Sequence, residues 1–322
     1  MVKFASRIAL FLALVAFTYG VLLIVILLTP DTSGYFASAI DKHKLLETTP
    51  SPKIIMVGGS SLALSVDSST LQANLGLPVV NMGIHGGLGL RYVMEEVRAE
   101  IKPGDWIIVY PEYQSFYGFF NGDDSFIALA SAFPEGIRYI SSPRQVLNMF
   151  KKLPISMQGQ VYARLLKLFY GEIGGIYTRR GFDANGDLIS PLGEPANTEW
   201  MDKPLFGPKD NTFEDEAIGG INAFADYAHC QGAHVVVIFA TISDFHYRDN
   251  ETKLLYVYTR LKSEGRIDYL SIPTEEVLPA SFFYDSPYHL NADGRKIKTA
   301  KMLGDLRQTM THSQSPQEWC RK

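Results

Sequence analysis

The chain has 322 residues, of which 46% are hydrophobic, and a formal net charge of −4. This length accommodates one large α/β domain or two small ones with a sizeable core. The acidic balance provides no broad basic field, which argues against a nucleic-acid-binding protein. The two cysteines, Cys230 and Cys320, match no metal-binding spacing and could pair only in an oxidising compartment. We therefore expect no metal, no cofactor and no nucleic-acid partner.

Residues 8–28 are almost wholly apolar, a run of about twenty residues that can cross a bilayer as a helix. Lys3 and Arg7 precede this run, which predicts a cytoplasmic amino terminus and an external domain. A cleaved signal peptide is the alternative, with a possible cleavage site at residues 37–39. We predict a membrane anchor over residues 1–30 and a membrane-proximal linker over 31–52, which includes a helical stretch over 34–49. The protein would then be a single-pass protein of the cytoplasmic membrane.

Residues 53–310 alternate between apolar runs and amphipathic patterns. The apolar runs predict strands at 53–57, 78–82, 105–110 and 233–240, with a short fifth strand at 267–270. The amphipathic patterns predict helices at 67–75, 90–101, 218–228 and 251–264, and a last helix from Asn291. Such alternation is typical of a parallel sheet with helices on both faces.

The pattern loosens between residues 111 and 211, where aromatic residues cluster and one helix is plausible over 162–170. We interpret this stretch as an insertion that shapes a substrate cleft. Residues 183–187 have the composition of a hairpin turn. The polar tail, 311–322, is expected to be loose.

Loops at the carboxyl ends of parallel strands meet at one edge of the sheet. On these loops stand Ser60 and Ser61, His85, Glu112 and the segment from Asp285 to His289. A serine, a histidine and an acid on converging loops are the components of a nucleophilic triad. Histidine can accept the serine proton near neutral pH, and the acid orients the imidazole.

Three short motifs resemble the conserved blocks of the SGNH (GDSL-type) hydrolases: GSSL at 59–62, NMGIHG at 81–86 and DSPYHLNADG at 285–294. The resemblance implies a flavodoxin-like parallel sheet. It also implies that Ser61 is the nucleophile, His289 the base and Asp285 the acid that orients the base. The backbone N–H groups of Ser61 and Gly86 would form the oxyanion hole.

The sequence departs from that family in two places. Three residues separate Asp285 from His289, where the family usually has two. The family's third block supplies an asparagine, and Glu112 stands in its place. An ionised carboxylate cannot donate a hydrogen bond to an oxyanion. We predict that Glu112, Tyr113, His85 and His246 contact the substrate.

The resemblance implies an extracytoplasmic acyl-ester hydrolase or O-acyltransferase that acts on a cell-envelope polysaccharide through a serine acyl-enzyme. A membrane-bound acyltransferase would be its partner. The alternative is a catalytically silent SGNH-like protein that binds glycan or scaffolds an envelope complex. The sequence identifies neither the acyl donor nor the acceptor.

Overall fold

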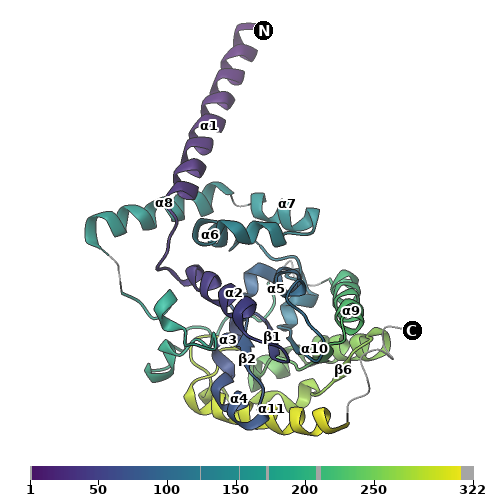
Figure 1. Ribbon diagram of the computed structural model, residues 1–322. Helices are drawn as coiled ribbons and strands as arrows, with labels where there is room; N and C mark the ends of the chain where they lie inside the picture. The colour runs from purple at the N-terminus through teal and green to yellow at the C-terminus, as the bar shows by residue number, and fades with distance from the viewer. Residues whose placement is uncertain (1, 124, 152, 172–173, 208–211, 313–322) are drawn as a thin grey trace.

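The core of the domain is a five-stranded sheet, seen in a computed structural model that describes residues 2–123, 125–151, 153–171, 174–207 and 212–312 (Figure 1). Its strands are β1 (Ile54–Gly58), β2 (Val79–Asn81), β3 (Trp106–Tyr110), β4 (His234–Val237) and β6 (Asp268–Tyr269). The spatial order is β2-β1-β3-β4-β6, and every neighbouring pair is parallel. All residues of β1, β2 and β3 are buried, as expected for apolar strands that are covered on both faces. The predicted parallel sheet is confirmed.

Two groups of helices cover the sheet. The first group is α3 (Ser60–Ser65), α4 (Ser68–Leu75) and α11 (Ala292–His312), which contact one another and strands β1 and β2. The second is α5 (Gly89–Arg98), α9 (Asp215–Cys230) and α10 (Asp244–Glu264), in which α5 contacts β1 and α9 contacts β4. Asp67 caps α4 as its side chain accepts a hydrogen bond from the Thr70 backbone N–H.

A small parallel pair, β5 (Ile242–Ser243) and β7 (Val277–Leu278), lies outside the main sheet and was not predicted. Each strand has only two residues, too few for an alternating pattern to be visible in the sequence. The turns η2 (Gly86–Leu88), η7 (Pro273–Glu275) and η8 (Ala280–Phe282) connect the larger elements.

The segment that we expected to be a linker is folded into the domain. It contains η1 (Tyr35–Ala37) and α2 (Ser38–Thr48), and Ala39, Lys42 and Leu46 of α2 are buried. The Lys53 ammonium group donates hydrogen bonds to the carbonyl oxygens of Leu46 and Thr49, which close the end of this helix. The domain therefore begins before residue 53.

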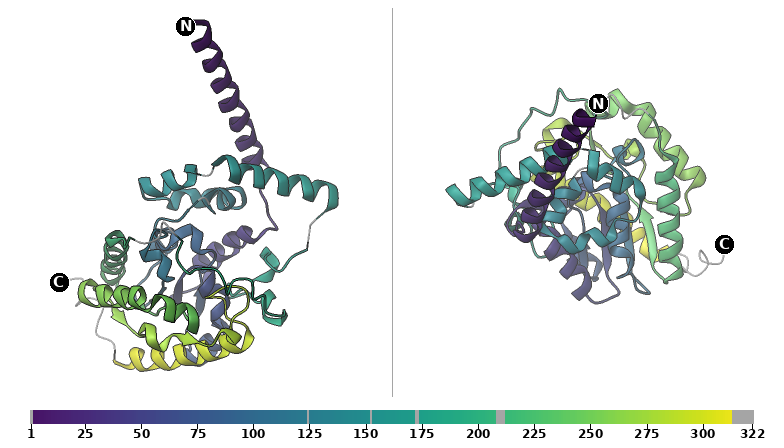
Figure 2. Two further views of the ribbon diagram at one scale, coloured as in Figure 1. Left: turned by 180° about the vertical axis from the view of Figure 1, so that it is seen from behind. Right: turned by 90° about the horizontal axis from the view of Figure 1, so that it is seen from above.

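Between β3 and α9 the described residues add no strand to the sheet. They form η3 (Tyr113–Phe116), α6 (Ser125–Ala132), η4 (Pro134–Tyr139), α7 (Pro143–Lys151), α8 (Leu153–Tyr170), η5 (Arg179–Gly181) and η6 (Ser190–Gly193). Helices α6, α7 and α8 gather at the base of α1 (Val2–Leu28), which projects away from the domain (Figures 1 and 2). Residues 3–26 of α1 are long and apolar enough to span a membrane.

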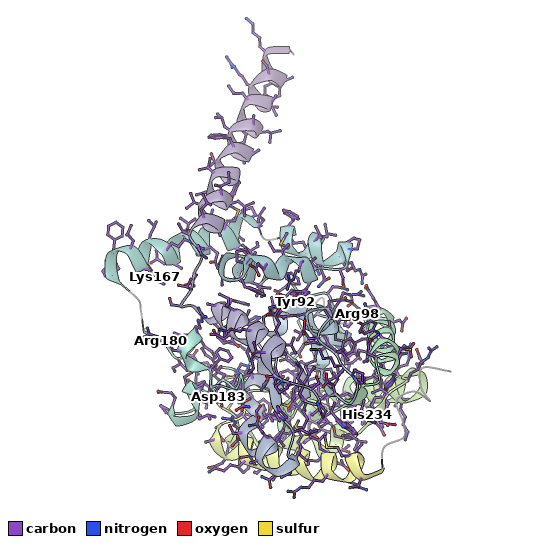
Figure 3. The ribbon with its side chains drawn as sticks, in the orientation of Figure 1. Tyr92, Arg98, Lys167, Arg180, Asp183 and His234 are labelled. Atoms are coloured by element: carbon purple, nitrogen blue, oxygen red, sulfur yellow. The ribbon has the colours of Figure 1, made fainter. Side chains whose placement is uncertain are left out.

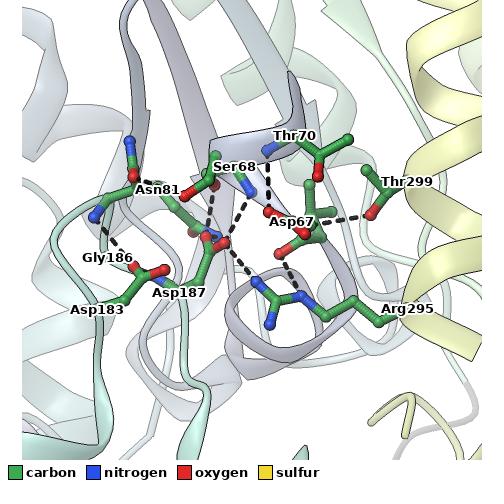
Figure 4. Close-up of polar contacts among 12 residues, drawn as sticks. Asp67, Ser68, Thr70, Asn81, Asp183, Gly186, Asp187, Arg295 and Thr299 are labelled. Carbon is green, nitrogen blue, oxygen red and sulfur yellow. Dashed lines mark hydrogen bonds and ion pairs between the residues drawn. The ribbon is translucent and has the colours of Figure 1, made fainter. Parts of the chain in front are cut away.

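The predicted hairpin turn at 183–187 is present, closed by an antiparallel bridge between Phe182 and Leu188. Its carboxylate Asp187 is fully buried, accepts a hydrogen bond from the Ser68 backbone N–H and pairs with Arg295 at 2.6 Å (Figure 4). The Lys42 ammonium group also donates hydrogen bonds to the carbonyl oxygens of Gly186 and Asn81. The hairpin is thus fixed to both the sheet and the last helix.

The expectation of a loose tail concerns mainly residues 313–322, which lie outside the described residues. Cys320 is one of them, so the possible pair of Cys230 and Cys320 lies outside the described residues.

Candidate active site

A chain of three side chains joins the loop after β1 to the loop before α11. Ser60 Oγ lies 2.9 Å from His289 Nε2, and His289 Nδ1 lies 2.7 Å from Asp285 Oδ1. An ionised carboxylate only accepts hydrogen bonds, so Nδ1 carries the proton that bonds Asp285. Nε2 is then free of a proton in the neutral ring and can accept the Ser60 hydroxyl proton. This geometry is that of a nucleophile, a base and an orienting acid.

Two glycines place Ser60 at the end of the strand. A Cβ on Gly58 would stand 2.8 Å from the Tyr110 carbonyl oxygen, and one on Gly59 would stand 2.5 Å from Glu112 Oε1. The first contact is with the backbone of β3, so Gly58 leaves no room for a side chain, whereas a side chain at Gly59 would displace the carboxylate of Glu112. Helix α3 begins at Ser60 itself, which leaves this side chain at the carboxyl edge of the sheet.

The longer spacing between Asp285 and His289 does not separate the two side chains. Phe283 and Leu290 form an antiparallel bridge, and the Tyr284 backbone N–H donates to the His289 carbonyl oxygen at 2.7 Å. Within this closed loop, Ser286 Oγ accepts hydrogen bonds from the backbone N–H groups of Tyr288 and His289. The turn between Asp285 and His289 accommodates the additional residue, so the Asp285 carboxylate still contacts the ring of His289.

Tyr177, which belongs to the insertion, also contacts Asp285. Its hydroxyl donates a hydrogen bond to Oδ2, the carboxylate oxygen that does not contact His289. Burial would raise the pKa of Asp285, but the hydrogen bond and charge interaction with His289, together with the bond from Tyr177, lower it below its usual value. Burial and the neighbouring Asp285 raise the pKa of Tyr177, so its hydroxyl stays a donor. No sequence pattern pointed to Tyr177.

The structure brings Ser60 to His289, whereas we predicted Ser61. The side chain of Ser61 is fully buried, and its Oγ has no hydrogen-bond partner among the described residues. Adjacent residues at a helix start point in different directions, since each turn takes 3.6 residues. The GSSL motif cannot distinguish the two hydroxyls. Ser60 therefore replaces Ser61 as the candidate nucleophile.

Glu112 occupies the place where the oxyanion hole was expected. Its Oε1 accepts a hydrogen bond from the Ser61 backbone N–H at 3.2 Å. A Cβ on Gly86 would stand 2.4 Å from its Oε2, so this carboxylate lies directly against Gly86. The two groups predicted to bind an oxyanion, Ser61 N–H and Gly86, thus surround a carboxylate of the protein itself. In this conformation the Ser61 N–H is already engaged.

A cleft of about 310 Å³ opens at this point. It is lined by Ser60, His85, Gly86, Gly87, Glu112, Gln114, Ser115, Phe119, Ser286, Pro287, Tyr288 and His289. His85 Nδ1 accepts a hydrogen bond from the Gly87 backbone N–H at 3.0 Å. In the neutral ring Nε2 therefore carries the proton and is the donor. His85 and Glu112 therefore lie where we predicted them, beside the candidate nucleophile.

Two residues predicted to contact substrate do not line this cleft. Tyr113 is fully buried and stacks on Phe239, with ring centroids 5.6 Å apart. His246 is buried as well, bonded through Nδ1 to Ser243 and through Nε2 to the Lys203 carbonyl oxygen. Burial lowers the pKa of His246. Both side chains are therefore part of the packing of the domain.

In the described part of the chain, no three His, Cys, Asp or Glu side chains come together in a way that would hold a metal ion. Comparison with protein-family models, with curated proteins and with solved structures found no match.

Proposed function

We propose that the protein is a membrane-anchored, SGNH-like acyl-ester hydrolase or O-acyltransferase that acts through an acyl-enzyme on Ser60. The observation that carries this proposal is the hydrogen-bonded chain from Ser60 through His289 to Asp285. The strand order also supports it. Renumbered within the main sheet, β2-β1-β3-β4-β6 reads 2-1-3-4-5, which is the flavodoxin-like order.

The proposed reaction has two halves. Ser60 Oγ attacks the acyl carbonyl carbon while His289 Nε2 takes the hydroxyl proton, and Asp285 stabilises the imidazolium that forms. The proton then passes from His289 to the leaving alcohol, and the acyl group stays on Ser60. In the second half, water or a sugar hydroxyl gives its proton to His289 and attacks the acyl carbon. The bond from that carbon to Ser60 Oγ then breaks, and His289 returns the proton to the serine. The products are a free acid with water and a new ester with a sugar.

Glu112 sets a condition on this cycle. An oxyanion next to its carboxylate would be repelled, and the Ser61 N–H would be unavailable as a donor. The carboxylate therefore has to move, or to be protonated, before the first tetrahedral intermediate forms. We propose that a bound glycan brings this about through its hydroxyl groups. A cell-envelope polysaccharide is the proposed substrate, as the family resemblance suggests, with a membrane-bound acyltransferase as the proposed partner.

The contact between Glu112 and the Ser61 N–H also favours a second candidate, a silent glycan-binding or scaffold protein with the same fold. Under this alternative the Glu112 carboxylate would stay bound to the Ser61 N–H, and the Ser60 hydroxyl would not attack a substrate.

The two candidates are distinguished by conversion of an O-acetylated oligosaccharide by the full chain in mild detergent, with acetate release and acetyl transfer followed by mass spectrometry. We expect Ser60→Ala to lose at least about a thousandfold in rate, because the whole triad depends on that hydroxyl. Ser61→Ala is the matched control and should retain most of the activity. Equal rates for the Ser60→Ala variant and the unsubstituted chain would refute the proposed mechanism. Binding of the oligosaccharide without conversion would support the scaffold.

A further inference from the structure

An apolar face on α8 is exposed in the structure. Ile155, Tyr162, Leu165 and Phe169 are spaced by seven, three and four residues, and each is between 47% and 75% exposed. This spacing places them on one side of the helix. The other side packs on α6, where Met157 is fully buried and Gln160 Oε1 accepts a hydrogen bond from Ser131. The exposed face therefore points away from the domain.

The preceding helix continues this surface. Val146, Leu147 and Phe150 of α7 are also exposed, at 43%, 60% and 52%. Exposed apolar groups of this extent are uncommon on a soluble domain and mark an interaction surface. We call these side chains of α7 and α8 the α7–α8 surface.

Arg164 joins α8 to the carboxyl end of the apolar helix α1. Its guanidinium group donates hydrogen bonds to the carbonyl oxygens of Ile26 and Thr29, which lie at the end of α1. A chain that spans a bilayer through α1 leaves the hydrocarbon at about this point. Helix α8 runs across the base of α1, and Lys167 marks its position there (Figures 2 and 3). If α1 spans a bilayer, this position brings α8 close to the bilayer surface.

The charges of the segment are compatible with such a position. Between Gly136 and Gly171 the sequence has six basic residues and no acidic residue. Basic residues next to exposed aromatic and aliphatic side chains are typical of helices that lie in the interface of a membrane with anionic lipids. Tyr162 and Tyr170, both exposed, are of the type enriched at that depth.

We propose that the α7–α8 surface rests in the headgroup region of the same bilayer that α1 spans. The inference depends on α1 as the anchor and not on the chemistry of Ser60. It goes beyond anchoring, because a second contact with the lipid fixes the tilt of the domain.

The test uses the full chain reconstituted into vesicles of phosphatidylcholine and phosphatidylglycerol, with lipids brominated near the headgroup as quenchers. Phe169→Trp introduces a reporter on the α7–α8 surface, and the fluorescence of the three native tryptophans is subtracted with the unsubstituted chain. Phe11→Trp reports the anchor separately, with lipids brominated deeper in the chain. Tyr256→Trp is the control, on helix α10, far from the base of α1 in Figures 1 and 2.

We expect the added fluorescence of Phe169→Trp to be largely quenched and that of Tyr256→Trp to be unaffected. If Phe11→Trp is quenched and Phe169→Trp is not, the proposal is wrong, and the surface is left to be covered by a protein partner. If neither is quenched, α1 is not embedded and the proposal also fails. Labelling of Ser60 by a serine-reactive probe in the same vesicles reports the proposed catalytic function independently of both results.

Discussion

Two adjacent serines follow β1, and the geometry of one helix start gives them different surroundings. Ser60 faces His289 at 2.9 Å, while Ser61 is buried and offers only its backbone N–H to Glu112. The sequence placed a serine, Asp285 and His289 at one edge of the sheet, because strand ends can be predicted from apolar runs. Which serine reaches the histidine depends on where the helix begins, to within one residue, and helix boundaries are poorly determined by local sequence.

Substitution of Glu112 should show how much a carboxylate in the oxyanion site lowers the rate of ester hydrolysis. Glu112→Gln keeps the oxygen that accepts from the Ser61 N–H, removes the negative charge and adds a donor. We expect hydrolysis of p-nitrophenyl acetate to rise roughly tenfold to a hundredfold. This gain is smaller than the factor of about a hundred to a thousand that a full oxyanion donor contributes, because the Gln oxygen still accepts from the Ser61 N–H. The measurement is steady-state turnover by the full chain in detergent.

Glu194→Gln, the same change at an exposed position, is the control and should leave the rate unaltered. A slower rate in Glu112→Gln than in the unsubstituted chain would mean that the carboxylate takes part in the reaction.

At the scale of elements, the insertion illustrates what sequence patterns cannot provide. The hairpin turn at 183–187 was predicted from its composition, but its position was not. It is held at the edge of β2 by a hydrogen bond from the Asn81 backbone N–H to the Asn185 carbonyl oxygen, and by the buried pair of Asp187 and Arg295. These partners are more than a hundred residues apart in the chain, so no local pattern reports them. The same holds for Tyr177 and Asp285.

Lys42, beneath this hairpin, should make the stability of the protein depend on pH. Burial lowers its pKa to about 7, from 10.5 in the unfolded chain, although the nearby carboxylates oppose the shift. Between these two values the unfolded state holds the additional proton, so stability rises with pH and the gain is absent below about pH 7. The slope from this one group is at most about 1.4 kcal/mol per pH unit.

The measurement is urea unfolding of the full chain in detergent at several values between pH 7 and pH 10. Lys42→Met has no proton to release, so this part of the slope should disappear in the variant. Lys44→Met, a matched change at an exposed position of the same helix, should retain it. Identical slopes in the Lys42→Met variant and the unsubstituted chain would show that Lys42 keeps its charge in the folded protein.

For the whole molecule, the apolar run and the alternating pattern were sufficient to predict one helix long and apolar enough to span a membrane, and an α/β domain with a parallel sheet. The extent of the domain was not predicted. A helix was expected before residue 53, but α2 is too polar for the sequence to indicate that it buries Ala39 and Leu46 in the domain. The layer of α6, α7 and α8 was also missed, apart from the second half of α8. Helices α6 and α8 of this layer contact α1, and α7 contacts α6. These contacts join segments far apart in the chain, so no local sequence pattern reports them.

The orientation in the membrane is a prediction at this scale. Lys3 and Arg7 ahead of the apolar run favour a cytoplasmic amino terminus, with the domain on the outer side. Protease added to spheroplasts should therefore digest the domain while a cytoplasmic marker stays intact. Digestion only after lysis would place the domain in the cytoplasm and contradict the proposed envelope substrate.

The central claim is that Ser60 is an activated nucleophile, and covalent labelling tests it most directly. The full chain in detergent is treated with a fluorophosphonate probe, and the modified peptide is identified by mass spectrometry. The account predicts a label on Ser60 that persists in Ser61→Ala, is abolished in Ser60→Ala and forms several orders of magnitude more slowly in His289→Ala, because an unassisted hydroxyl is a weak nucleophile. A label on Ser61, or no label on the intact chain, would contradict it.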